Sequence, residues 1–254
     1  MAHGLAVECG VCEKECRAIN FPFIKHVRTG LPWVVMKAAL SLDGRITYKQ
    51  GRGGAITGRK SKELVHGLRN QLDAILIGAD TAAIDDPSLT TRLQNQGTKD
   101  PLRIILDCTL RTDPQSRIFH QQSDAETWIF CTVSSQKTSL RAKREQALLR
   151  AGAKIFEVSP TKNGRVDIQE VLQVLGENKI LSLLVEGGAA IFGSFLRHDL
   201  VDEVYLLLAP FFIGDPGQPL LTGYFANDRD QAKRLRDVEI SRVGEDTLIH
   251  GLLA

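Results

Sequence analysis

The hydrophobic positions of the chain fall into short apolar runs that alternate with stretches of helical periodicity. Apolar runs typical of buried strands lie at 33–40, 73–79, 102–107, 127–131, 153–158, 180–185 and 201–210. Helices with one apolar face are predicted at 59–71 and 168–175, and small and apolar residues have helical spacing at 189–196. Two further helices are predicted at 80–86, which Pro87 would end, and at 139–151, with Gly152 just past its end. Two late strands, 235–243 and 247–253, flank a turn at 244–246 and predict a hairpin. We therefore expect an α/β fold, a mostly parallel sheet with an antiparallel C-terminal hairpin and helices on both faces.

Local signals mark several boundaries. Thr57 or Gly58 can cap the helix that begins near residue 59. Asp167 can cap the helix over 168–175, with Glu170 as its capping-box partner. The first strand is expected to be followed by a tight turn at 41–44 and a short returning strand at 45–47. Gly30-Leu31-Pro32 predicts a boundary between a leader, 1–31, and the rest of the chain, 32–254.

Composition and charge narrow the class of protein. The 254 residues are 43% hydrophobic and 24% charged, which is ordinary for a globular protein. The net charge is +2 and no long Lys/Arg run occurs, so we expect no nucleic-acid partner. No apolar run approaches the ~18 residues of a membrane span, and the first residues lack the layout of a signal peptide. These features predict a cytoplasmic protein without a membrane partner.

Three of the five cysteines crowd at the start of the chain. Cys9, Cys12 and Cys16 have a spacing that resembles part of a metal or iron–sulfur motif, while Cys108 and Cys131 lie far away. A fourth Cys or His at ligand spacing is missing, since His26 lies ten residues beyond Cys16. The other interpretation is a set of reduced thiols near the end of a leader. We expect no metal.

The segment ILSLLVEGGAAIFGSFL, at 180–196, carries the strongest chemical signal. A buried strand ends at an acid, Glu186, and passes through Gly187-Gly188 into a helix. Paired glycines let the backbone approach a ligand, and the helix N-terminus directs N–H groups and a positive dipole toward phosphate. In open α/β sheets, ligands bind at the carboxyl ends of the strands. The segment therefore predicts a phosphate cradle with an ionisable group beside it.

Two other clusters of polar residues follow predicted strands. Lys37 lies inside the first apolar run, ahead of Ser41-Leu42-Asp43-Gly44-Arg45, and Thr81, Asp85 and Asp86 precede Arg92. Each cluster also has a structural explanation. A lysine in a strand can extend its amine to solvent, Asp-Asp-Pro terminates helices, and Lys37 with Glu186 can form a plain buried ion pair.

The order and spacing of these clusters are far more specific than any one of them. KAALSLDGRI, DAILIGADTAAIDDPSLTTR, LRIILD and LLVEGGAAIFGSFL closely resemble the reductase domain of the bacterial bifunctional riboflavin biosynthesis enzyme, a pyrimidine deaminase/reductase. The resemblance runs from about residue 32 to 254, and ECRAINFPFIKHVRTGLP resembles the joint that follows the deaminase domain. The deaminase's zinc motifs do not occur in the chain. We expect a reductase domain whose deaminase is separate or missing.

The resemblance implies a dihydrofolate-reductase-like fold, a homodimer and NADPH as cofactor. The implied substrate is a phosphorylated aminopyrimidine whose ribosylamino side chain is reduced to a ribitylamino chain. Carried over by position, the implied catalytic residues are Lys37, Asp85 and Glu186, and the implied substrate-binding residues are Gly53, Arg69, Leu89, Arg92 and Glu186. The implied cofactor-binding residues are Ala39, Ala55, Thr81, Asp85, Cys108, Gly188, Ala189, Ala190, Ile191, Phe192, Gly193 and Ser194.

The chain departs from the family pattern in one loop. Relatives usually have Ser-x-Trp after the first turn, where this chain has Gly53 and Ala55, and Cys108 replaces a usual serine or threonine. Two alternatives therefore stay open: a reductase of the same fold acting on another heterocycle, and a nucleotide-binding protein without turnover. Arg59 and Lys60 are candidate partners for the cofactor 2′-phosphate. The apolar runs 204–209 and 252–253 fit either the core or a dimer interface.

Overall fold

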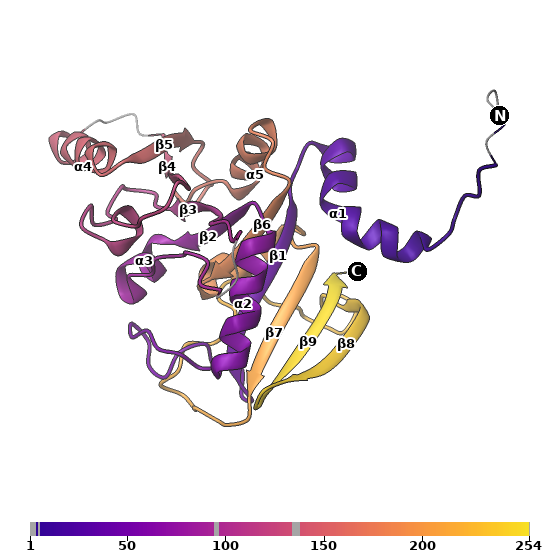
Figure 1. Cartoon of the computed structure of the whole chain (residues 1–254). Coiled ribbons are helices and arrows are strands. Elements are labelled where there is room, and N and C mark those ends of the chain that lie inside the picture. Colours follow the sequence, from indigo (N-terminus) through magenta and orange to yellow (C-terminus); the bar gives the residue numbers. More distant parts are fainter. Residues whose placement is uncertain (1–3, 5, 94–96, 134–137, 254) are drawn as a thin grey trace.

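Nine strands form one sheet in the computed structural model, which describes residues 4, 6–93, 97–133 and 138–253 (Figure 1). The elements along the chain are α1 (Glu13–Thr29), β1 (Trp33–Ser41), α2 (Arg59–Gln71), β2 (Ala74–Gly78), α3 (Ala79–Asp85), β3 (Leu102–Leu106), η1 (Arg117–Phe119), β4 (Thr127–Thr132), α4 (Ser139–Arg150), β5 (Ala153–Val158), α5 (Ile168–Glu177), β6 (Ser182–Gly187), α6 (Ala189–Arg197), β7 (Glu203–Ala209), β8 (Leu235–Val243) and β9 (Asp246–Leu253).

The strand order is β5-β4-β3-β2-β6-β1-β7-β9-β8. The seven strands from β5 to β7 pair in parallel, while β9 pairs antiparallel with both β7 and β8. The predicted fold class is confirmed, including the C-terminal hairpin. Strands β1 and β6 lie side by side at the centre, so their carboxyl ends meet at one edge of the sheet.

Apolar residues on the two faces of the sheet form two cores. Along β2, Ile75 and Ile77 join one core with Leu68 of α2, Ala82 of α3 and Leu148 of α4. On the opposite face, Leu76 joins Val171 and Leu175 of α5 and Phe192 and Phe195 of α6. Because successive side chains of a strand point to opposite faces, helices cover both faces of the sheet, as the sequence predicted.

The leader contains a long helix that the sequence analysis missed. The ring of Phe21 in α1 stacks on Trp33 at 4.9 Å, and Lys25 Nζ lies 2.5 Å from Asp202. The chain then passes Gly176, where an added Cβ would lie 1.8 Å from the Gly30 carbonyl oxygen. The second half of α1, from Phe21 onward, therefore packs against the sheet, while residues 6–20 are exposed.

Two local expectations were wrong. Asp167 does cap α5 through the Gln169 N–H, but Glu170 accepts from the Ser159 N–H and not from its capping-box partner. The expected return strand after β1 is absent from the described residues, since Arg45 forms only an isolated bridge with Pro219. Glu170 is engaged by a residue eleven positions earlier and Arg45 by one in a loop distant in sequence, and a local pattern reveals neither partner.

Candidate functional site

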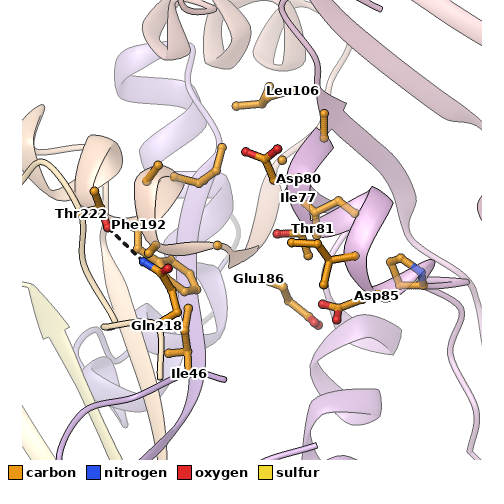
Figure 2. A pocket seen from close by; sticks show the side chains of 18 of the residues that line it. Ile46, Ile77, Asp80, Thr81, Asp85, Leu106, Glu186, Phe192, Gln218 and Thr222 are labelled. Carbon is orange, nitrogen blue, oxygen red and sulfur yellow. Dashed lines mark hydrogen bonds between the residues drawn. The ribbon is translucent and has the colours of Figure 1, made fainter. Parts of the chain in front are cut away.

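A cavity of about 770 Å³ opens at the carboxyl ends of the central strands (Figure 2). Its walls come from β1, α3, the N-terminal half of α6, and the loops after β3 and β5. The predicted site residues that line it are Lys37, Ala39, Arg69, Thr81, Asp85, Leu89, Cys108, Glu186, Gly188, Ala189, Ala190, Ile191, Phe192 and Ser194. The structure thus brings most of the predicted site together.

Four predicted residues lie outside the lining of this cavity. Ala55 lines a neighbouring pocket of about 290 Å³, which shares Lys37 and Glu186. The Arg92 residue is exposed, and its backbone N–H donates to His66 Nδ1. Gly193 is buried in α6, and an added Cβ would lie 2.1 Å from the Thr222 carbonyl oxygen. Glycine is therefore required here so that the segment at Thr222 can pack against the helix. The fourth residue, Gly53, lies against Asp85.

A buried cluster of charges forms the floor of the cavity. Glu186, near the end of β6, accepts two hydrogen bonds of 2.9 Å from the guanidinium of Arg69. Lys37 Nζ, on the adjacent strand β1, lies 3.5 Å from Glu186 Oε2. Arg69 also donates to the Thr90 carbonyl at 3.2 Å. All three charged side chains are only 11–12% exposed. The guanidinium of Arg69, which the resemblance implies binds the substrate, is therefore engaged by Glu186.

This arrangement fixes the charge of Glu186. Burial alone raises the pKa of a carboxyl group, but Lys37 and Arg69 overcome that effect and lower the pKa of Glu186 to about 2. The guanidinium in turn has a raised pKa, because the attraction of Glu186 outweighs the desolvation of Arg69. At neutral pH, Glu186 is therefore a carboxylate that holds two cations, and it is poorly suited to donate a proton.

Asp85 has the opposite character. It ends α3 and lines the cavity beside Glu186 (Figure 2), and desolvation raises its pKa above the ordinary range. An added Cβ at Gly53 would lie 1.7 Å from Asp85 Oδ1, so only glycine fits there while Asp85 keeps this position. The helix-terminating role belongs to Asp86, which has a positive φ and forms the C-cap. Asp85 is thus available for proton transfer.

The N-terminus of α6 faces the cavity. Gly188 is the N-cap, no side chain caps this end, and residues 188–192 line the wall. A Cβ at Gly187 would lie 2.6 Å from the ring of Phe192, and its φ of 100° favours glycine. A helix end whose first N–H groups lack a side-chain partner suits a phosphate-bearing cofactor. The residues present therefore fit the pyrophosphate of a dinucleotide.

Sequence reasoning missed much of the outer wall. Ile46 and Gln218 line one end of the cavity, and Gln218 donates to Thr222 Oγ1 at 3.3 Å (Figure 2). Further lining residues are Asp80, Arg111 and Arg165. Most of these residues lie in loops, where no periodicity indicates a direction. The only available signal was that their loops follow the carboxyl ends of parallel strands.

The described residues contain neither a metal-binding cluster nor a membrane-spanning helix. Among the described residues, no group of three His, Cys, Asp or Glu side chains is arranged to hold a metal ion, and all five cysteines are free. Of the helices in the described ranges, none is long and apolar enough to cross a membrane.

The fold is an α/β domain with a cavity at the carboxyl ends of its central strands, and comparisons with known proteins specify its family. The model of the RibD C-terminal domain matches residues 32–249. The riboflavin biosynthesis protein RibD of Bacillus amyloliquefaciens is 34% identical over 244 residues, which are 96% of this chain and 63% of that protein. The Escherichia coli (strain K12) RibD is 30% identical over 258 residues, with 97% and 67% covered.

Solved structures agree with this match. Acinetobacter baumannii RibD superimposes with a TM-score of 0.82 at 26% identity, covering 99% of this chain and 66% of that one. A deaminase/5-amino-6-(5-phosphoribosylamino)uracil reductase from Thermotoga maritima gives 0.79 at 28% identity, covering 100% and 65%. The chain belongs to the RibD C-terminal domain family. It spans 63% of the length of its Bacillus relative.

Proposed function

We propose that residues 32–254 form a reductase that uses NADPH to convert the ribosylamino side chain of 5-amino-6-(5-phosphoribosylamino)uracil to a ribitylamino chain. The observation that carries this proposal is the Lys37–Glu186–Arg69 cluster, which lies on the floor of a cavity whose wall is the uncapped N-terminus of α6. Support comes from the Thermotoga maritima relative, whose name includes this reductase activity.

The proposed reaction makes specific demands on the site. The ribose must open, so its ring oxygen leaves the anomeric carbon and takes up a proton while a C=N bond forms. When bound, NADPH supplies a hydride to that carbon, and the imine nitrogen gains a proton. Lys37 and Asp85 are the proposed proton donors, since Glu186 is held as a carboxylate. The role of Glu186 is to position the Lys37 ammonium.

The direct test follows NADPH absorbance with the purified protein and either the deaminated or the aminated pyrimidine phosphate. We expect turnover with at least one of them, and Lys37→Ala should lower kcat/KM by about 10²–10⁴-fold because a proton donor is lost. Lys154→Ala is the matched control. Lys154 also lies on a strand, β5, but its amine is exposed, pairs with Glu126 and does not line the cavity, so activity should stay unchanged. No turnover of either pyrimidine by the wild-type protein would contradict the proposal.

A second candidate function rests on the pocket beside Ala55. This pocket adjoins Lys37 and Glu186, so a differently shaped heterocycle could reach the same charges. A substrate panel that includes a pterin separates the two candidates. A strong preference for the pterin would favour the second, and NADPH binding without turnover of any substrate would favour a non-enzymatic role.

A further inference from the structure

A second group of charges lies at the other end of the cavity. Leu106 and Asp80 lie toward one end, while Ile46, Glu186 and Asp85 lie toward the other (Figure 2). The Arg111 guanidinium contacts Asp80 at 2.6 Å, so it belongs to the first end. Arg165 lies in the loop after β5, and the strand order places β5 on the side of β3 and away from β1. Two arginines from separate loops therefore line the end that is remote from Lys37.

Three of the cationic side chains that line the cavity already form ion pairs with carboxylates. Lys37 and Arg69 both contact Glu186, and Arg111 contacts Asp80. Within the described ranges, Arg165 forms no ion pair, and neither does Arg52, which lies beside Gly53 at the opposite end. Arg165 is thus the cation available for an anion at the remote end.

The backbone presents Arg165 from an ordered turn. Its N–H donates to Thr161 Oγ1 at 3.1 Å, and its carbonyl accepts from the Thr161 N–H at 2.7 Å. Pro160 and Val166 pair in an isolated bridge, and Val166 is 5% exposed in the core. The side chain therefore extends from a fixed base, which lowers the entropic cost of holding a ligand.

The two cationic residues that the sequence suggested as partners of the cofactor 2′-phosphate lie elsewhere. Arg59 and Lys60, at the start of α2, both lie within ion-pair distance of Glu63, and neither lines the cavity. A phosphate monoester on the cofactor ribose therefore needs another partner. Guanidinium groups bind such oxygens in bidentate fashion, with charge-assisted hydrogen bonds.

We propose that Arg165, assisted by Arg111, binds the 2′-phosphate of the cofactor ribose and so makes the domain select NADPH over NADH. The inference rests on the proposed function, because it requires a dinucleotide with its reactive end at Lys37. The Arg111–Asp80 pair is exposed, with 52% and 78% of the two side chains accessible, so Arg111 can exchange this contact at little cost.

The test measures nucleotide binding by calorimetry and does not need turnover. Adenosine 2′,5′-bisphosphate is compared with 5′-AMP on the wild type, Arg165→Gln and Lys162→Gln. Arg165→Gln should weaken the bisphosphate about 10-fold to 100-fold and leave 5′-AMP within about twofold. Lys162 lies in the same exposed loop outside the cavity lining, so Lys162→Gln removes the same charge and should leave both affinities unchanged.

The outcomes separate this inference from the proposed function. If the wild type prefers the bisphosphate and Arg165→Gln keeps that preference, the assignment of Arg165 is wrong and the reductase proposal stands. Equal weakening by both variants would mean that only the general positive charge of the loop matters, which also overturns the assignment. If the wild type binds neither nucleotide, NADPH is not the cofactor, and both the proposed function and this inference are wrong.

Discussion

The two ends of the cavity hold ion pairs of opposite kinds. At the inner end, Glu186 and its two cations are 11–12% exposed and project from α2 and the adjacent strands β1 and β6. At the outer end, the Asp80–Arg111 pair is 52–78% exposed and Arg111 lies in a loop. The inner charges are therefore fixed by regular elements of the core, two strands and a helix, while Arg111 of the outer pair can move toward a ligand.

This difference is also energetic. A buried ion pair leaves an uncompensated charge when one partner is removed, so breaking it is costly even where forming it gains little. An exposed pair is screened by water and contributes little in either direction. Substitutions at the inner end should therefore lower both activity and stability. Substitutions at the outer end should change ligand specificity and leave the stability of the fold nearly unchanged.

The largest predicted effect is the loss of Arg69. Arg69→Ala removes both hydrogen bonds to Glu186 and leaves a buried carboxylate with Lys37 alone, so it should lower the free energy of unfolding by about 3–5 kcal/mol. Chemical denaturation measures this change. Arg59→Ala, on the same helix but 84% exposed, is the matched control and should change stability by less than about 0.5 kcal/mol. Similar losses of unfolding free energy in both variants would show that any substitution in α2 destabilises the protein, and that the ion pair with Glu186 is not the cause.

An intermediate effect should appear in the acid dependence of stability. The pKa of Glu186 lies at about 2 in the folded protein, below its ordinary value of 4.5, so its contribution is present above the ordinary pKa and is lost as the pH falls toward the folded one. In Glu186→Gln that dependence disappears. The stability difference between wild type and variant should therefore shrink by on the order of 2 kcal/mol between about pH 7 and about pH 3. A difference that is constant over this range would mean that Glu186 titrates normally.

The smallest effect is expected at the outer end. Asp80→Asn removes the exposed partner of Arg111 and should change the unfolding free energy by no more than about 0.5 kcal/mol. Thermal or chemical unfolding of the wild type and the variant, at low and at high salt, measures this change. The stability difference between the two proteins should stay within about 0.5 kcal/mol at both salt concentrations. A loss comparable to that of Arg69→Ala would remove the contrast between the two ends.

The sheet could be predicted because apolar runs identify buried strands. The inner site was predicted differently: the family resemblance placed Lys37 and Glu186 together, and the pairing of β1 with β6 brings them within 3.5 Å. The partner of Arg69 could not be predicted, since an arginine late in a helix has the same local pattern whether it faces a ligand or a carboxylate. Only the packing of α2 against β6 decides between them.

Other features were hidden for different reasons. Helix α1 buries none of its residues completely and contains Pro22, so it lacks both the apolar stripe and the uninterrupted pattern of a predictable helix. The turn that carries Arg165 is held by hydrogen bonds between its own Thr161 and Arg165, and the direction of a loop side chain leaves no trace in periodicity. Residues in such loops that determine ligand specificity can be identified only from a structure.

The contact between Gly53 and Asp85 links two positions that a sequence presents as independent. Because a Cβ at residue 53 would lie 1.7 Å from Asp85 Oδ1 and 3.6 Å from its Cα, a serine at this position requires the Asp85 carboxylate to rotate away. The residue at 53 therefore sets the direction of the proposed proton donor from a facing loop, so a substitution there would change the aim of the acid without touching the acid itself.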